Sequence, residues 1–195
     1  MAHFKELHAE IQSVIQEKLG QLTSPLIESL GGSPMVITLH ETVDIWLLPA
    51  NMITQPTNSI RELAKPTGQY HHQLKTNSDP IAYGRTRALG ADPADWLVEG
   101  ICSSADIAQQ FELAIDEIDN AGLSDDLQAR LLLVPAYHLQ AFWLIDSTAP
   151  EDDSRQLIVV IEAPGEYGFE LRTKHYTPEE FLNKLRQVRH VQGLI

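Results

Sequence analysis

The stretch "YHLQAFWLID" (residues 137–146), followed by "QLIVVIEA" (residues 156–163), indicates the fold class of this chain. Both runs are short, apolar and rich in aromatic or β-branched residues, a composition typical of β-strands. An acidic loop that contains a proline joins them. Pro164 and Gly165 then predict a turn into a third strand over 167–173. Because strands joined by short loops usually pair with each other, we expect an antiparallel three-stranded meander.

Helical patterns lie on both sides of these strands. Apolar residues recur at three- and four-residue spacing over 3–19 and again over 104–121. The segment "TPEE" at 177–180 has the pattern of a capping box at the start of a terminal helix. The chain is therefore expected to be α+β: an antiparallel sheet, with its C-terminal three-stranded meander, packed against helices from the N-terminus, the middle and the C-terminus.

Weaker signals come from the segments between these elements. Short helices are expected to begin at Ser24, Asp92 and Ser124, since each of these residue types is a favoured N-cap. Residues 35–48 alternate between apolar and polar with a period of two. That alternation predicts a long strand, or a hairpin bent near Glu41, with one face on the core.

Residues 49–91 have the least regular pattern in the chain. Four prolines interrupt this segment, with asparagine, serine and glycine between them. The whole chain has 195 residues, of which 43% are hydrophobic, and this suits one compact domain. We therefore expect a single α+β domain over residues 1–195, with a loop-rich, insertion-like segment at about 49–91.

Composition excludes several classes of function. The single cysteine cannot form an internal disulfide, so nothing favours secretion. The N-terminal residues lack the apolar core of a signal peptide, and the longest charge-free apolar run is shorter than the ~20 residues that a bilayer span needs. A net charge of −13 would repel nucleic acid. A soluble cytoplasmic protein without a nucleic-acid or membrane partner is expected.

The negative charge is concentrated in one part of the sequence. Between Ala91 and Ala129 there are ten acidic residues and no lysine or arginine. One interpretation is a solvated helix face, and the other is a docking face for a basic partner. The docking hypothesis places Glu112, Asp116 and Asp119 on the outward face of the helix over 104–121.

The segment from Arg61 to Arg87 has the opposite local charge. Its arginines, Arg61, Arg85 and Arg87, could add to the partner-binding surface. They could also fold against the acidic helix, in which case the acidic block would be structural.

Cys102 has two possible roles. Ser103 and Asp106 fit a capping box that makes Ser103 the N-cap, so that Cys102 and Ile107 would form a hydrophobic staple and the thiol would be structural. In the alternative, Cys102 is a nucleophile activated by the helix N-terminus, with His138 as its base and Asp146 or Glu162 as the group that orients the histidine.

Motifs for metals and cofactors are missing from the sequence. "HETVD" at 40–44 lacks the second histidine of a zinc-protease motif, and the adjacent His71 and His72 would face opposite ways on a strand. No phosphate-binding glycine loop follows a strand. We therefore expect no metal and no cofactor.

Two functions remain as hypotheses. The first is an acidic, non-enzymatic protein that binds another protein or peptide with a basic surface, as an adaptor, a chaperone-like protein or an inhibitor. The alternative is a cysteine-dependent hydrolase or acyltransferase that uses Cys102 and His138.

Overall fold

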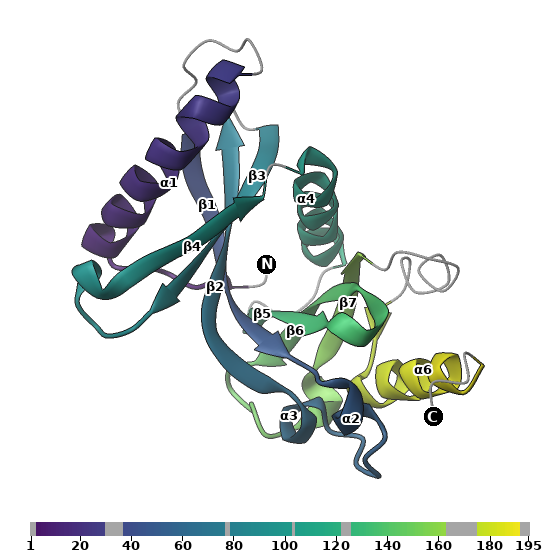
Figure 1. Cartoon of the computed structure of the whole chain (residues 1–195). Helices are drawn as coiled ribbons and strands as arrows, with labels where there is room; N and C mark the ends of the chain where they lie inside the picture. The colour runs from purple at the N-terminus through teal and green to yellow at the C-terminus, as the bar shows by residue number, and fades with distance from the viewer. Residues whose placement is uncertain are drawn as a thin grey trace. The chain divides into compact units, whose positions relative to one another are not determined.

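The structure is a computed structural model, and it describes residues 3–29, 37–76, 79–102, 104–121, 126–162 and 175–191. Its strands form one eight-stranded, mostly antiparallel sheet in the order β4-β3-β2-β1-β5-β6-β7-β8 (Figure 1). The mixed content of helices and strands confirms the predicted α+β class.

The elements have the following bounds. The helices are α1 (Ala9–Ser29), α2 (Ala50–Ile53), α3 (Ile60–Leu63), α4 (Ala105–Asn120) and α6 (Pro178–Val191). The strands are β1 (Ile37–Leu47), β2 (Lys65–Thr76), β3 (Asp79–Ala88), β4 (Trp96–Cys102), β5 (Leu127–Val134), β6 (Leu139–Asp146), β7 (Leu157–Glu162) and β8 (His175–Tyr176). Strands β1 and β5 pair in parallel, whereas the pairs β2–β3, β3–β4, β5–β6, β6–β7 and β7–β8 are antiparallel.

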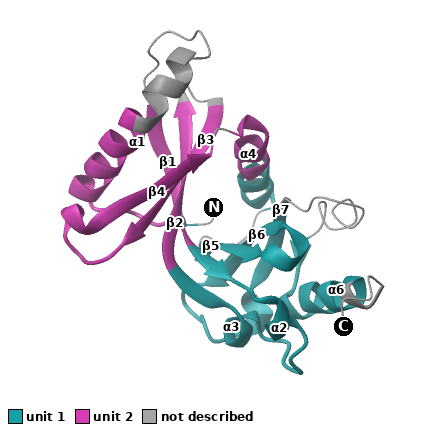
Figure 2. Ribbon diagram, in the orientation of Figure 1, with its two compact units in different colours: residues 1–3, 45–67, 113–195 teal, residues 4–44, 68–112 magenta. Residues whose placement is uncertain are grey.

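The chain divides into two compact units (Figure 2). Unit 1 comprises residues 1–3, 45–67 and 113–195, and unit 2 comprises residues 4–44 and 68–112. The predicted single domain stays a prediction.

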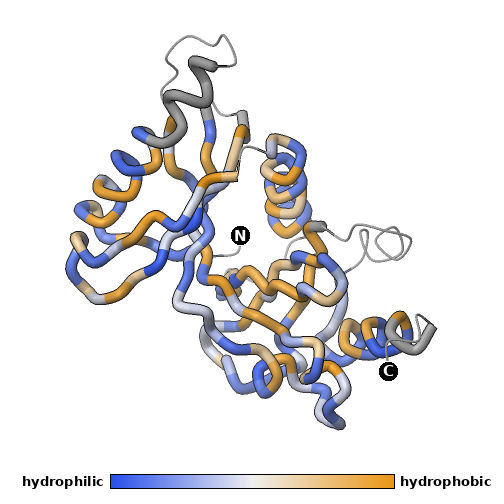
Figure 3. The backbone as a smooth tube through the Cα atoms, viewed as in Figure 1, coloured by the Kyte–Doolittle hydropathy of each residue, from blue (hydrophilic) through white to orange (hydrophobic). Residues whose placement is uncertain are grey.

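Unit 1 is built around the strands that the opening stretch of sequence predicts. Apolar residues run along β5, β6 and β7 (Figure 3), and Trp143 of β6 is fully buried. Its ring meets Trp46 edge to face at 5.4 Å, and its indole N–H donates to Gln156 Oε1 at 2.9 Å. Phe181 of α6 packs in the same core cluster. Burial of rings this large contributes a major share of the stability of a core.

Unit 2 has a smaller apolar core. Ile11, Ile15 and Leu19 of α1 pack on Leu74 and on other apolar residues of the sheet. Spacings of four residues place these α1 side chains on one face of the helix. Helix α1 therefore covers one face of the β2–β3 pair, which contributes Leu74 and Ala82 to this core.

The strands over 137–146 and 156–163 are confirmed as β6 and β7, which pair antiparallel. The third strand of the predicted meander, over 167–173, lies outside the described residues. The capping box of the terminal helix is formed as predicted: the Thr177 backbone N–H donates to Glu180 Oε2 at 2.9 Å, and the Glu180 N–H donates to Thr177 Oγ1 at 3.2 Å.

Three predicted short helices are wrong. Ser24 lies within α1, so no separate helix begins there. Asp92 caps a single 3-10 turn that leads into strand β4. The helix expected after Ser124 is replaced by strand β5. An apolar run such as that of β5 suits a buried helix and a buried strand equally well, and the pairing with β1 and β6 decides for the strand.

The predicted loop-rich segment at 49–91 is also corrected. It contains α2, α3 and both strands of the long antiparallel pair formed by β2 and β3. Pro66 and Pro80 lie at the second positions of these two strands. Proline is tolerated at the start of a strand, so it does not interrupt the ladder there.

Candidate functional site

Strand β2 presents polar side chains on the face opposite to α1. His71, Gln73 and Lys75 alternate along it, and the register sets His71 opposite Arg85 and Gln73 opposite Tyr83 on β3. Residues directly opposite on neighbouring strands share a face of the sheet. These five residues are called the polar face of unit 2 below.

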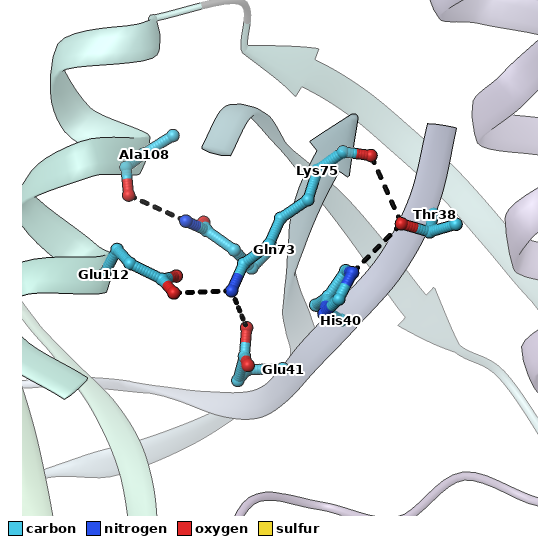
Figure 4. Close-up of polar contacts among 7 residues, drawn as sticks. All are labelled: Thr38, His40, Glu41, Gln73, Lys75, Ala108 and Glu112. Carbon is cyan, nitrogen blue, oxygen red and sulfur yellow. Dashed lines mark hydrogen bonds and ion pairs between the residues drawn. The ribbon is translucent and has the colours of Figure 1, made fainter. Parts of the chain in front are cut away.

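An ion-pair cluster lies at one end of the polar face (Figure 4). Lys75 Nζ lies 2.6 Å from Glu112 Oε1 of α4 and 3.6 Å from Glu41 Oε2 of β1, and the Lys75 side chain is only 8% exposed. Next to it, Gln73 Nε2 donates to the Ala108 carbonyl of α4 at 2.7 Å. One ammonium thus faces two carboxylates, and the cluster joins the first turns of α4 to the sheet.

Strand β2 also carries two buried, adjacent histidines, His71 and His72, whose surroundings differ. His71 is stacked between the rings of Phe111, at 4.4 Å, and Tyr83, at 4.8 Å. Burial lowers the pKa of His71 well below its usual 6.5, and the charges of His72 and Arg85 act in the same direction. Burial also lowers the pKa of His72 to about 3. Both rings are therefore neutral at neutral pH.

His72 is held by two threonine hydroxyls. Its Nδ1 lies 2.9 Å from Thr42 Oγ1, and its Nε2 lies 2.7 Å from Thr86 Oγ1. The neutral ring has one N–H and one bare nitrogen. One threonine hydroxyl can accept from the N–H and the other can donate to the bare nitrogen, so both ring nitrogens are satisfied. The adjacent histidines thus occupy different environments, as alternation along a strand requires.

A cavity of about 290 Å³ opens beside the polar face, and it is called the β3–β4 cavity below. Its lining residues are Gln69, Tyr83, Arg85, Glu99, Gly100, Ile101 and Cys102. Glu99 is the extra residue of a β-bulge, because Arg85 pairs with Gly100 while Thr86 pairs with Val98. Bulges redirect side chains at sheet edges. Here the Glu99 carboxylate accepts hydrogen bonds from Gln69 Nε2 and Arg87 Nε.

Cys102 is the last residue of β4 and is half-buried in this cavity. Helix α4 begins at Ala105, and Ser104 Oγ accepts a hydrogen bond from the Ile107 N–H at 3.4 Å. Ser104 is therefore the N-cap, which corrects the predicted staple because Cys102 lies two positions before the cap. Ser103 lies outside the described residues.

The other candidate catalytic residues belong to unit 1. His138 is exposed, has a left-handed backbone with φ of 49°, and ends the 3-10 turn that precedes β6. Asp146 ends β6 at the opposite end, roughly 25 Å away at the rise of a β-strand. Its Oδ1 accepts from the Thr148 N–H and hydroxyl, and Arg155 contacts its other oxygen.

The Thr148 hydroxyl, which donates to Asp146, lowers the pKa of that carboxyl, and Arg155 adds to the effect. Asp146 therefore anchors the loop that follows β6. The structure does not bring Asp146 and His138 together.

The three predicted acidic contact residues lie in two environments. Asp116 and Asp119 are exposed on α4, and neither has an ion-pair partner among the residues that the structure describes. Glu112 is half-buried and paired with Lys75. The competing hypothesis, that the basic segment folds against the acidic helix, therefore applies to Glu112.

The three predicted basic contact residues also differ. Arg61 contacts Glu151, and Arg87 Nε lies 2.5 Å from Glu99 Oε1. Arg85 lies 5.7 Å from the Tyr83 ring centroid and has no carboxylate within ion-pair reach in the described part of the chain.

Sequence reasoning missed Lys75, Gln73, Tyr83 and Glu41 as members of the site. The available signal was the alternation of polar residues in "QYHHQLKT" at 69–76, which indicates a strand with a polar buried face. The four prolines of the segment favoured a loop instead of a strand, and the alternation was not used.

Comparison with known proteins finds no matching family model, no similar curated protein and no similar solved structure. Within the described ranges, no helix has the length and apolar character to cross a membrane. The same ranges contain no group of three histidine, cysteine, aspartate or glutamate residues with the geometry of a metal site.

Proposed function

We propose that this chain is a non-enzymatic protein that binds another protein or peptide, as an adaptor, a chaperone-like protein or an inhibitor. The exposure of Asp116 and Asp119 on α4 carries the proposal. Two unpaired carboxylates one turn apart repel each other, and a basic partner would relieve that repulsion. The net charge of −13 adds long-range attraction to such a partner.

The proposed surface leaves out Glu112. This side chain already pairs with Lys75, so transferring it to a partner would leave a largely buried ammonium without its nearest counter-charge. Asp116 and Asp119 are named below as the acidic stripe. The proposal also places the protein in the cytoplasm, because its single cysteine needs no oxidising compartment.

Affinity capture from the source cell tests this function. The baits are the wild type, the variant D116K/D119K and the control E6K/E10K, which makes the same change of net charge at two exposed positions elsewhere. We expect one protein partner that the wild type and the control retain at low salt and release as salt rises, because exposed charges are screened beyond about 8 Å at physiological ionic strength.

D116K/D119K should capture this partner at least about tenfold less, the change that corresponds to roughly 1.4 kcal/mol. Circular dichroism spectra of the three baits verify that each is folded. If the acidic-stripe variant keeps the same partner with an unchanged salt dependence, the docking surface is elsewhere.

The alternative function is a cysteine-dependent hydrolase or acyltransferase. It is favoured by one observation, which is that Cys102 lines a cavity. Among the lining residues only Glu99 carries a carboxylate that could act as a base, and Arg87 and Gln69 bind both of its oxygens. His138 belongs to the other unit.

Alkylation of Cys102 separates the two functions. The binding function predicts that iodoacetamide labels the native protein at neutral pH no faster than it labels a free thiol, because the thiolate is the nucleophile. Labelling well above the free-thiol rate would favour the enzyme.

A further inference from the structure

Arg85 lines the β3–β4 cavity, and no carboxylate of the described residues forms an ion pair with it. It is half-buried, it lies against the Tyr83 ring, and its Nε is buried with no acceptor among the described residues. A buried donor that lacks an acceptor costs free energy, and the cost is greater for a charged group. An acceptor is therefore expected at this guanidinium.

The carboxylate that lines the same cavity does not supply the acceptor. Glu99 receives Arg87 Nε on Oε1 and Gln69 Nε2 on Oε2, so each of its oxygens already has a donor. In a chain with 27 acidic residues, internal carboxylates are plentiful. Arg61, Arg87 and Arg155 each contact one, which sets Arg85 apart from them.

The space beside Arg85 suits a small ligand. Gly100 is directly opposite Arg85 on the neighbouring strand, and a Cβ placed at Gly100 would meet nothing within 4 Å. The ring of Tyr83 and the side chain of Cys102 provide apolar walls. A volume of about 290 Å³ is at the lower end of the range for small-molecule sites.

The local charge indicates which ligand fits. Arg85 and Arg87 contribute two positive charges and Glu99 one negative charge, which leaves a single positive charge to be neutralised.

We propose that the β3–β4 cavity binds a small carboxylate with an apolar body. The planar guanidinium of Arg85 matches the two oxygens of a carboxylate, and its position against the Tyr83 ring fixes its orientation. The apolar body occupies the space over Gly100. This site shares no residue with the acidic stripe, and it binds a ligand of the opposite charge to the partner proposed for the stripe.

Titration of the full chain with benzoate, followed by amide NMR shifts of Gly100 and Ile101, tests the proposal. Benzamide, which has the same shape without the charge, and inorganic phosphate are titrated in parallel at constant ionic strength. We expect saturable shifts with benzoate at a dissociation constant of about 1 mM or tighter, and at least about tenfold weaker binding of the other two probes.

Three variants locate the site. R85Q should weaken benzoate binding at least about tenfold, the effect of losing a charge-assisted hydrogen bond. R61Q makes the same change of net charge outside the cavity and should bind as the wild type. G100V should also weaken binding by filling the space, and it leaves Arg85 in place, so it tests the site even where R85Q lowers stability.

The proposal is overturned if benzoate and benzamide shift the amides equally, or if R85Q and G100V both bind benzoate as the wild type does. Tighter binding of phosphate than of benzoate overturns the assignment to a carboxylate. Because the acidic stripe is unchanged in R85Q, loss of benzoate binding and loss of the protein partner are separate results.

Discussion

His72 shows how one buried residue links the fold to pH. Its two ring nitrogens are satisfied by Thr42 and Thr86, and the ring is fully buried. The usual pKa of histidine is 6.5, whereas burial lowers that of His72 to about 3. Between these values the unfolded chain binds a proton that the folded chain does not, so acid favours unfolding.

We predict that the free energy of unfolding falls as the pH is lowered from 6.5 to 5. His72 contributes a slope that averages about 1 kcal/mol per pH unit over this range, and the stability that it supplies is fully present only above pH 6.5. His71, which is also neutral when folded, adds in the same direction. Urea unfolding at several pH values measures the slope.

H72Q removes one titrating group, so its slope should be about 1 kcal/mol per pH unit shallower, whatever its stability at pH 7. Equal slopes for H72Q and the wild type would show that His72 is protonated in the folded chain.

At the scale of elements, Arg186 joins helix α6 to the segment that links α2 and α3. Its guanidinium donates to the carbonyls of Ile53, Gln55 and Thr57 and to Asn58 Oδ1. The segment over 53–58 has little regular structure of its own, so these bonds satisfy carbonyls that no strand or helix would pair. One side chain thereby positions a turn that is more than 120 residues away in the sequence.

R186A is expected to lower the free energy of unfolding by about 2 kcal/mol, because several carbonyls lose a charged donor together. R186K keeps the charge but not the planar fork, and it should recover less than half of the loss. The exposed Lys184 on the same helix provides the control K184A, with an expected change under about 0.5 kcal/mol. Urea unfolding gives all three values, and an R186A stability equal to that of K184A would contradict this role of Arg186.

At the scale of the whole molecule, the net charge of −13 opposes folding. Like charges are closer together in the folded chain than in the unfolded one, and this self-repulsion lowers stability. Salt also weakens exposed ion pairs such as that of Arg87 and Glu99, but such pairs contribute only about 0–1 kcal/mol each. We therefore expect the net repulsion to outweigh these pairs.

The stability of the protein should accordingly rise with sodium chloride, by on the order of 1 kcal/mol between about 20 mM and about 500 mM, over which the Debye length falls severalfold. Thermal or urea unfolding at both concentrations measures the change. D116K/D119K carries four fewer net negative charges and should gain less from salt. A wild type that salt destabilises would indicate that ion pairs, and not net repulsion, dominate.

Local signals in the sequence determined several elements by themselves. The capping box at Thr177, the apolar face of α4 and the strands β6 and β7 depend on residues close together in the chain, and the structure confirms them. These features need only side chains within a few residues of each other, so a linear pattern contains all the information that specifies them.

Only the tertiary structure decided the rest. Strand β5 was predicted to be a helix, and it is a strand because β1 and β6 pair with both of its edges. Lys75 pairs with Glu112, which is 37 residues away in the sequence. The cavity beside Arg85 is lined by residues of three strands, β2, β3 and β4. Such contacts depend on which elements become neighbours, and the energy that selects them comes from burial and pairing between distant segments, which no local pattern in the sequence specifies.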